Sequence, residues 1–522
     1  MRPKHYRLSS LNLSTRPRLL HFSRLTYNLY RAAYTVEPPL NFLLYFSDLL
    51  RYAAVGVAAG TAAVVAAPLV LGAAGFAGAG VAAGSIAAAT VKTGGLFAMA
   101  AGNAAIGGIT GGIAALGAKM FDSFVDIKLL ICGSGSEAHA FAGIASSVKG
   151  TDVRVFSLNQ DEADYWFAAM HKNDLKVTFH RKGEEPTCIT SRLPLATSNP
   201  EDAMQDIDIV VFVLPAFAHQ VLLYTLKPYF KPGTIIVGLP GTPGFEYQVL
   251  HVLGEVGQQC TIMNFESSPW VSCISDFSVG CEVLGTKETL LGAIKQGKGV
   301  APKKDPASTL QYLLGPLPKL NVSGHLLGVQ LMSVNAYLHT SILYGQWEGW
   351  QGKPVDEPPL FYNGLTEPTA DLLSSISDEI VSIARVIELK TEADLSHVVH
   401  IHLWLVRRYS HDISNKSTLY KAIQTNAAFQ GIKHPVKTTE DGKFLPDFTH
   451  RYITEDVPYG LVVIRGIAEI VGVQTPNIDK VLTWCQEKMG KEYLVNSKLQ
   501  GKDVGLSTAP QRYGFITLES IL

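Results

Sequence analysis

Apolar and polar positions follow two different periods after residue 126. Ile127–Ile131 is a short apolar run rich in branched residues, which is typical of a buried parallel strand. Ala140–Val148 has helical spacing, Lys149–Asp152 has the composition of a turn, and Val153–Leu158 is a second apolar run. Together these segments predict a strand–helix–strand unit whose two strands are parallel.

Two further strands are predicted downstream of this unit. Ile209–Leu214 is followed by Pro215 and an Ala-rich stretch, and Thr234–Gly238 is followed by Leu239-Pro240-Gly241. Loops that follow parallel strands lie at the carboxyl edge of the sheet, where ligands bind in open α/β folds. We therefore expect these loops to border a ligand site.

The helical period dominates the C-terminal part of the chain. In Ala370–Leu389, apolar residues recur at helical spacing and form one face. The other predicted helices are Gly328–Tyr344, Leu395–Tyr409, Thr418–Asn426, Gly460–Val471 and Asn477–Gly490. We place a domain boundary in Pro302–Leu320, where four prolines loosen the pattern.

The first 126 residues have a different composition. Residues 1–36 hold several arginines and no Asp or Glu, which is typical of a mitochondrial presequence or of a basic tail beside a membrane segment. Ala53–Ala118 holds one charged residue, Lys92, and is long enough for two or three spans of about 20 residues. Its alanines and glycines would let helices approach closely in lipid. The alternative is a low-complexity linker.

The fold class expected from these patterns is α/β. A Rossmann-type doubly wound nucleotide domain is followed by a mainly α-helical domain and preceded by an Ala/Gly-rich helical segment of membrane type. The expected segments are a basic tail (1–52), the Ala/Gly-rich helices (53–126), the Rossmann domain (127–320) and the helical domain (321–522).

Charge and cysteine content exclude several classes of protein. The formal net charge of the 522 residues is −1, so no global field favours nucleic acid. The six cysteines show neither a C-x-x-C pair nor a His-paired metal spacing. We therefore expect a reducing compartment, no disulfide framework and no metal site.

The residues between the first strand and the first helix match a dinucleotide fingerprint. Gly133-Ser134-Gly135-Ser136-Glu137-Ala138 fits G-x-G-x-x-G/A, with Gly133 for the tight turn, Gly135 for close approach of a pyrophosphate, and Ala138 for close helix packing. The helix N-terminus then offers N–H groups to phosphate. The alternative is a glycine-rich turn in an ordinary α/β domain. The cofactor residues expected are Gly133, Gly135, Ser136, Ala138, Asn159 and Pro215.

Asn159 follows the second strand, where an acidic residue often binds the ribose of NAD. Its amide could bond a ribose hydroxyl. Asn159–Tyr165 contains no Arg or Lys that could bind a 2′-phosphate. The sequence therefore favours NAD over NADP.

Longer motifs resemble one enzyme family. They are LPAFAH (Leu214–His219), IIVGLPGTPGFEYQ (Ile235–Gln248), FESSPW (Phe265–Trp270), EVLGTK (Glu282–Lys287), HTSILYGQW (His339–Trp347), RYITEDVPYG (Arg451–Gly460), KEYLV (Lys491–Val495) and PQRYGF (Pro510–Phe515). Over Ile127–Leu522 the chain resembles the opine dehydrogenases, most of all the octopine and tauropine group. Such enzymes join a 2-oxo acid, usually pyruvate, to an amino acid and reduce the imine with NADH.

The resemblance implies roles for four residues. A histidine on an apolar helix is usually structural, but the matching family residue is the acid/base group, so His339 is expected to be catalytic. Arg451 would bind a substrate carboxylate through two parallel bonds, and Asp456 would orient His339. For both, the alternative is a surface ion pair. Glu266 matches a position near the amino-acid substrate, and its alternative is a loop carboxylate.

The chain departs from the family in two places. The family commonly has Asn-Gly or Asn-Ala where this chain has Ser136-Glu137, so Glu137 would either point to solvent or weaken cofactor binding. Family enzymes also begin at about Ile127, and a natural fusion and an erroneous joining of genes both explain the extension. Within it, Val64–Ala88 resembles the small interferon-alpha-inducible membrane proteins, which implies a membrane-associated hairpin.

Our prediction is an NADH-dependent opine dehydrogenase that is membrane-associated, for instance on mitochondria, through residues 53–118. The region from Ile127 alone would be cytoplasmic, and no nucleic-acid partner is expected. The first alternative is another Rossmann dehydrogenase, acting on a hydroxy acid or a polyol phosphate. The second is a membrane-bound interaction protein without turnover.

Overall fold

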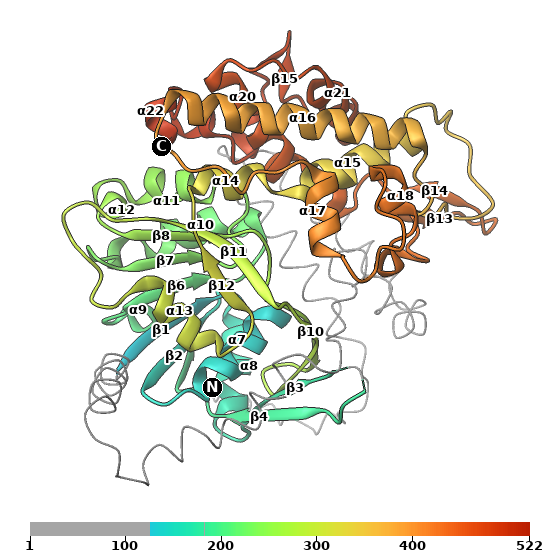
Figure 1. The fold of residues 1–522 in the computed structure, drawn as a ribbon. Helices are drawn as coiled ribbons and strands as arrows, with labels where there is room; N and C mark the ends of the chain where they lie inside the picture. Colours follow the sequence, from blue (N-terminus) through green and yellow to red (C-terminus); the bar gives the residue numbers. More distant parts are fainter. Residues whose placement is uncertain (1–125, 182) are drawn as a thin grey trace, which may run out of the picture. The chain divides into compact units, whose positions relative to one another are not determined.

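The computed structural model describes residues 126–181 and 183–522 (Figure 1). Its largest sheet has eight strands in the order β12-β11-β8-β7-β6-β1-β2-β5. The strands are β1 (Ile127–Cys132), β2 (Thr151–Phe156), β5 (Leu195–Thr197), β6 (Ile209–Phe212), β7 (Ile235–Gly238), β8 (Thr261–Phe265), β11 (Thr289–Lys295) and β12 (Lys319–Val322). The strands from β5 to β8 pair in parallel, while β11 pairs antiparallel with β8.

The strand order makes this a doubly wound sheet. The chain runs outward from β1 to β2 and β5, then returns to β6 on the other side of β1. Successive residues of β1 alternate between two apolar clusters, with Leu129 and Ile131 in one and Leu130 and Cys132 in the other. Both faces of the sheet are therefore buried, and the direction reverses between β1 and β6, where such folds bind ligands.

Helices cover the two faces of the sheet. The first cluster includes residues of α7 (Ser136–Ser146), α8 (Gln160–Met170) and α13 (Pro306–Leu314). The second includes residues of α9 (Pro200–Met204), α10 (Ala216–Leu226) and α11 (Phe245–Leu253). The expected strand–helix–strand unit and the strands at residues 209 and 235 are thus confirmed.

A second sheet was not predicted from the sequence. It has the order β4-β3-β10-β9 and comprises β3 (Leu175–Phe179), β4 (Thr187–Ser191), β9 (Trp270–Asp276) and β10 (Gly280–Thr286). Strands β3 and β10 are about a hundred residues apart in the chain and pair in parallel, which is a contact that local periodicity cannot reveal. Pro302–Leu320, where a domain boundary is expected, holds α13 and β12, and β12 belongs to the main sheet. The boundary itself stays a prediction.

From Leu326 the described chain is mainly helical. The longer helices are α15 (Val334–Trp347), α16 (Glu367–Lys390), α17 (Ile401–Arg408), α20 (Val462–Val471) and α21 (Pro476–Met489). The shorter ones are α14 (Leu326–Leu331), α18 (Leu419–Gln424), α19 (Arg451–Thr454) and α22 (Leu518–Ile521), and a π-helical turn, η5, spans Val457–Leu461. Their apolar faces share one core.

Two helix boundaries differ from the prediction. The helix expected over Gly328–Tyr344 is two helices, α14 and α15, because Ser333 leaves the helical region with φ −70° and ψ 70°. The apolar period continues across the break, so periodicity could not show it. The helix expected over Leu395–Tyr409 begins only at Ile401, where the His400 ring caps α17 by accepting from the His402 N–H.

Polar contacts join the α/β part to the helical part. The Gln330 side chain in α14 accepts from the Gly244 N–H at 3.1 Å and donates to the Glu246 carboxylate and to the Tyr247 hydroxyl. Glu246 is buried, and its Oε2 has no partner among the described residues. Desolvation raises the pKa of Glu246 to about 7.

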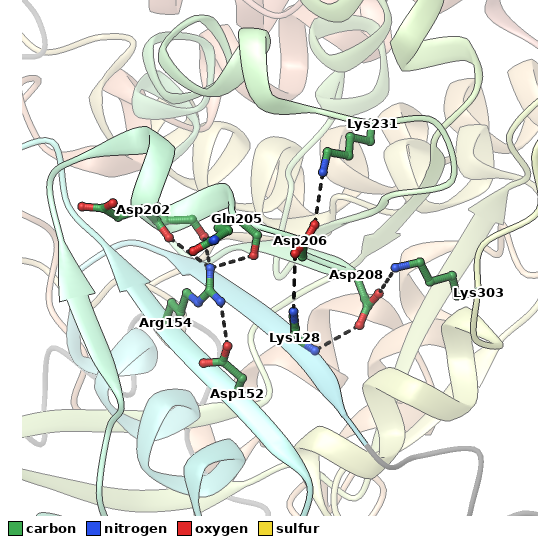
Figure 2. Close-up of polar contacts among 10 residues, drawn as sticks. Lys128, Asp152, Arg154, Asp202, Gln205, Asp206, Asp208, Lys231 and Lys303 are labelled. Carbon is green, nitrogen blue, oxygen red and sulfur yellow. Dashed lines mark hydrogen bonds and ion pairs between the residues drawn. The ribbon is translucent and has the colours of Figure 1, made fainter.

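A charged network joins β1 and β6 at the edge of the sheet where these strands begin (Figure 2). Lys128 donates its backbone N–H to Asp208 at 3.1 Å, and Lys303 pairs with Asp208 at 3.3 Å. Lys231 pairs with Asp206 at 3.3 Å. The Lys231–Asp206 pair is exposed on both sides, and such pairs contribute about 0–1 kcal/mol, so it has a modest structural role at the edge where the strands begin.

Two further results concern membranes and metals. In residues 126–181 and 183–522, no helix is both long and apolar enough to cross a bilayer. The same residues contain no group of three His, Cys, Asp or Glu side chains arranged to hold a metal ion. The expected membrane segment and basic tail lie outside the described residues.

Candidate active site

The fingerprint turn lies at the point where the sheet reverses direction. Gly133 has φ +132°, and a Cβ there would overlap the Val213 carbonyl oxygen just after β6. Gly135 is different, because its φ is −75° and a Cβ would meet nothing within 4 Å. The turn therefore needs glycine at 133 for its own packing, while the missing Cβ at 135 leaves open space outside the protein.

The first turn of α7 has the features of a phosphate site. Its N-cap residue, Gly135, has no side chain that could accept a hydrogen bond. The N–H groups of Ser136 and Glu137 therefore donate to no capping side chain. Ala138 is fully buried, as close packing against the sheet requires. Pro215, the N-cap of α10, follows β6, which is the neighbour of β1 in the sheet. The residues present fit the pyrophosphate of a dinucleotide.

A buried histidine fixes this turn. The His139 ring bonds the Gly135 carbonyl oxygen through Nδ1 at 2.9 Å and accepts the Ser278 N–H at Nε2, also at 2.9 Å. Because Nε2 accepts, Nδ1 carries the hydrogen. Burial lowers the pKa of His139 to about 4, so the ring is neutral. His139 was not predicted from the sequence, although its place directly after the fingerprint was a usable signal.

Asn159, the residue expected to bind the ribose, also caps a helix. The Asn159 Oδ1 caps α8 by accepting from the N–H groups of Asp161 and Glu162, so only its amide N–H groups can serve a ribose. Buried Glu162 accepts the hydroxyls of Ser134 and Ser157, which joins the fingerprint to the end of β2. Glu162 was not predicted from the sequence, and ribose binding by Asn159 stays a prediction.

Glu137 does not point away from the site. The Ser268 hydroxyl donates to its carboxylate at 2.7 Å. Burial raises the pKa of the Glu137 carboxyl, and the nearby cations Lys287 and Arg451 oppose that rise. The Glu137 carboxylate is therefore bonded to Ser268 and interacts electrostatically with Lys287 and Arg451.

The second cluster centres on His339 in α15. Its Nδ1 lies 2.7 Å from the Asp456 carboxylate and its Nε2 lies 2.9 Å from the Tyr362 hydroxyl. The ring stacks on Tyr452 with centroids 3.9 Å apart and planes 26° apart. His339 is 1% exposed. The predicted His339–Asp456 contact is therefore present, and the aromatic enclosure is an addition that the sequence did not indicate.

Arg451 begins α19, directly before Tyr452. Its guanidinium pairs with Glu455 at 3.2 Å, and 63% of its side chain is exposed. Burial raises the pKa of the Glu455 carboxyl, whereas Arg451 acts to lower it. A half-exposed guanidinium with one carboxylate partner still has N–H donors available to an incoming anion.

Glu266 lies in the loop after β8, next to Ser267. The Lys287 ammonium donates to the Ser267 hydroxyl at 2.5 Å. Desolvation lowers the pKa of Lys287 to about 7, and Glu266 and Glu137 counteract that lowering. Lys287 thus interacts electrostatically with Glu266 and Glu137, and Glu137 interacts with Arg451. This series of opposite charges joins the α/β part to the helical part.

The sequence places the chain among known enzymes. It is 51% identical over 397 residues to tauropine dehydrogenase from Arabella iricolor, a match that covers 76% of this chain and 100% of that protein. The chain belongs to the opine dehydrogenase family. It is also 43% identical over 397 residues to octopine dehydrogenase from Mizuhopecten yessoensis, covering 76% of this chain and 98% of that one. The family described as NAD/NADP octopine/nopaline dehydrogenase, alpha-helical domain, matches residues 322–489.

Solved opine dehydrogenase structures have the same fold. Octopine dehydrogenase with NADH and L-arginine is 42% identical with a TM-score of 0.73, covering 76% of this chain and 98% of that chain. The same enzyme type with NADH and pyruvate is 41% identical with a TM-score of 0.71, covering 76% and 97%. The expected combination of a Rossmann-like domain with a helical C-terminal domain is thereby confirmed over about residues 125–522.

Proposed function

We propose that this chain condenses pyruvate with an amino acid and reduces the resulting imine with NADH. Membership of the opine dehydrogenase family makes it an NAD-dependent oxidoreductase acting on the CH–NH group of donors. The observation that carries the assignment to particular residues is the His339–Asp456 contact at 2.7 Å, with Asp456 five residues after Arg451 in the chain. When bound beside Gly135, NADH supplies the hydride.

Arg451 is the group we assign to the 2-oxo acid. A planar guanidinium can hold a carboxylate through two parallel N–H···O bonds, which fixes both the position and the orientation of the carbonyl. Glu455 supports one side of the guanidinium. Binding of the substrate carboxylate by Arg451 therefore positions the reacting carbon, while the rest of the substrate stays free to move.

His339 is the group we assign to proton transfer. Forming an imine requires the amine to lose protons and the carbonyl oxygen to leave as water, so one group must both accept and donate protons near neutral pH. Imidazole does this best. Asp456 bonds Nδ1, which leaves Nε2 as the nitrogen that changes protonation, and the carboxylate stabilises the charged ring.

The amino-acid partner would meet the carboxylates on the α/β side. Glu266 and Glu137 suit an ammonium group, and the cation between them, Lys287, keeps the two carboxylates from repelling each other. The test is to incubate the full chain with NADH, pyruvate and, in turn, arginine, alanine, glycine, taurine and β-alanine. NADH loss that requires both pyruvate and one of these amines supports the proposal, and loss with pyruvate alone contradicts it.

We also propose that residues 53–118 attach the enzyme to a membrane. Lys92 is their only charge, their small residues recur at helical spacing, and Val64–Ala88 resembles the interferon-alpha-inducible membrane proteins. The full chain should then stay with the membrane fraction through a carbonate wash, while a fragment from Ile127 should not. Release of the full chain by carbonate would refute the attachment.

A further inference from the structure

His339 is buried, and both of its ring nitrogens have hydrogen-bond partners. The side chain is 1% exposed, Asp456 occupies Nδ1, and the Tyr362 hydroxyl occupies Nε2. The Tyr452 ring covers one face of the imidazole, and Phe361 meets it at 5.7 Å between centroids. Neither ring nitrogen is therefore open to a substrate in this arrangement.

A chain of hydroxyls leads away from the ring. Tyr362 shares a side-chain hydrogen bond with Tyr452. Tyr362 is fully buried and stacks on Phe429 with centroids 4.1 Å apart and planes 17° apart, which fixes its hydroxyl in place. Tyr452 follows Arg451 directly and interacts with it electrostatically. The series Asp456–His339–Tyr362–Tyr452 thus ends beside the guanidinium that we assign to the substrate.

A phenol hydroxyl can pass a proton in either direction because it both donates and accepts. With neutral His339, the Tyr452 O–H donates to Tyr362 and the Tyr362 O–H donates to Nε2. With protonated His339, every bond reverses, so the Nε2 N–H donates to Tyr362 and the Tyr452 O–H points outward. Reversal breaks and forms one O–H bond at each hydroxyl and moves one net proton, with no oxidation or reduction.

We propose that Tyr362 and Tyr452 relay the proton between His339 and the substrate held by Arg451. This inference rests on the proposed function, in which His339 is the acid/base group. Burial raises the pKa of Tyr362 well above its ordinary value, so the phenolate is excluded and the proton moves in concert along the chain. His450 also interacts with His339, but burial lowers the pKa of His450 to about 4, so it is neutral and does not compete.

The test uses Tyr362→Phe, which keeps the aromatic stack and removes only the hydroxyl. We expect kcat to fall about a hundredfold, with the KM for pyruvate and the Kd for NADH unchanged. The dependence of kcat on the deuterium fraction of the solvent should curve in the parent, where several protons move together, and become linear in the variant. Tyr452→Phe should give the same loss through the other hydroxyl of the relay.

Tyr337→Phe is the matched control. Tyr337 lies on the same helix, two residues before His339, and its buried hydroxyl has no hydrogen-bond partner among the described residues. Its removal should leave kcat and the solvent dependence at parent values. Thermal melting and NADH binding verify that each variant is folded.

His339→Gln separates failure of the relay from failure of the proposed function. If His339→Gln keeps the parent kcat, the acid/base assignment falls and the relay falls with it. If His339→Gln is inactive while Tyr362→Phe turns over at the parent rate, the relay alone is overturned. Tyr362 would then only cover Nε2 of His339 and move away when substrate binds. A low kcat in Tyr362→Phe with the parent's curved solvent dependence also overturns the relay.

Discussion

At the scale of single residues, Gly133 and Gly135 have different roles in the same turn. Gly133 is required by the backbone, whereas Gly135 has an ordinary φ and open space at its Cβ position. Gly135→Val should therefore leave the melting temperature unchanged and abolish NADH binding, because the side chain fills the space proposed for the pyrophosphate. Calorimetric titration with NADH measures this, and parent-like binding would remove the site from this turn.

Gly133→Ala is the contrasting variant. The added Cβ would overlap the Val213 carbonyl, and the φ of +132° is unfavourable for any L side chain. Strain of this kind typically amounts to about 1–3 kcal/mol. We expect the midpoint of urea unfolding, measured without NADH, to be lower in Gly133→Ala than in the parent. Equal stability of the two glycine variants would show that the turn is not strained at 133.

Arg451→Lys tests the two-bond grip on the substrate. The positive charge is retained but the planar pair of N–H donors is lost. We expect the KM for pyruvate to rise about tenfold or more with little change in NADH affinity. Arg407→Lys, on an exposed position of α17, is the control. An unchanged KM in Arg451→Lys would mean that another group holds the carboxylate.

Asp456→Asn removes the anionic partner of His339 and keeps its shape. The imidazolium would lose the charge that favours it. Turnover should fall, because the ring loses the carboxylate that orients it and stabilises its charged form. Parent-like turnover in Asp456→Asn would show that Asp456 has no part in the reaction.

At the scale of elements, α16 shows what the sequence could predict. Its apolar period gave the helix to within three residues, because Leu373, Ile376, Ile380, Ile383 and Ile387 are buried on one face as the spacing requires. The Thr366 side chain caps the first turn by accepting from the Thr369 N–H. The break at Ser333 and the pairing of β3 with β10 could not be predicted, because one depends on a single residue's backbone and the other on distant contacts.

Ile376→Ala tests how far α16 stabilises the helical core. The side chain is fully buried, and losing it should cost about 2–5 kcal/mol of unfolding free energy through lost apolar burial and a residual cavity. Asp371→Ala, on the exposed face of the same helix, should change it by less than about 0.5 kcal/mol. Equal effects from the two variants in chemical denaturation would contradict the packing described.

At the scale of the whole described molecule, the contact between the α/β part and the helical part depends on a buried carboxyl. The pKa of Glu246 is raised in the folded state to about 7, so folding favours the protonated form. The stability that it contributes is present below the ordinary Glu pKa of about 4.3 and is lost as pH rises through 7. Unfolding free energy should therefore fall between pH 5 and pH 8.

Glu246→Gln should flatten that fall and make the protein more stable than the parent at pH 8, because the amide can still accept from Gln330. Glu255→Gln, in neighbouring α12 (Glu255–Gln258) and exposed, is the control and should keep the parent slope. Denaturant midpoints measured across this pH range give the answer. A parent-like slope in Glu246→Gln would place the pH dependence elsewhere.

The motifs that predicted His339, Arg451 and Asp456 are short and continuous, so the sequence alone could suggest them. Their enclosure could not be predicted in the same way. Tyr362 comes from a segment between α15 and α16, and His139 and Glu162 bond residues far from them in the chain. The contacts of Tyr362 and Glu162 depend on the completed fold, and no local spacing indicates them, whereas His139 directly follows the fingerprint.

The most direct test of the central claim follows the hydride. The full chain is incubated with pyruvate, the preferred amino acid and NADH deuterated at its reactive position, and the product is analysed by mass spectrometry. Reductive condensation predicts one compound in which the amine nitrogen and one deuterium are both bonded to the former carbonyl carbon of pyruvate. Deuterated lactate, or an amine-free product of any kind, would contradict the account.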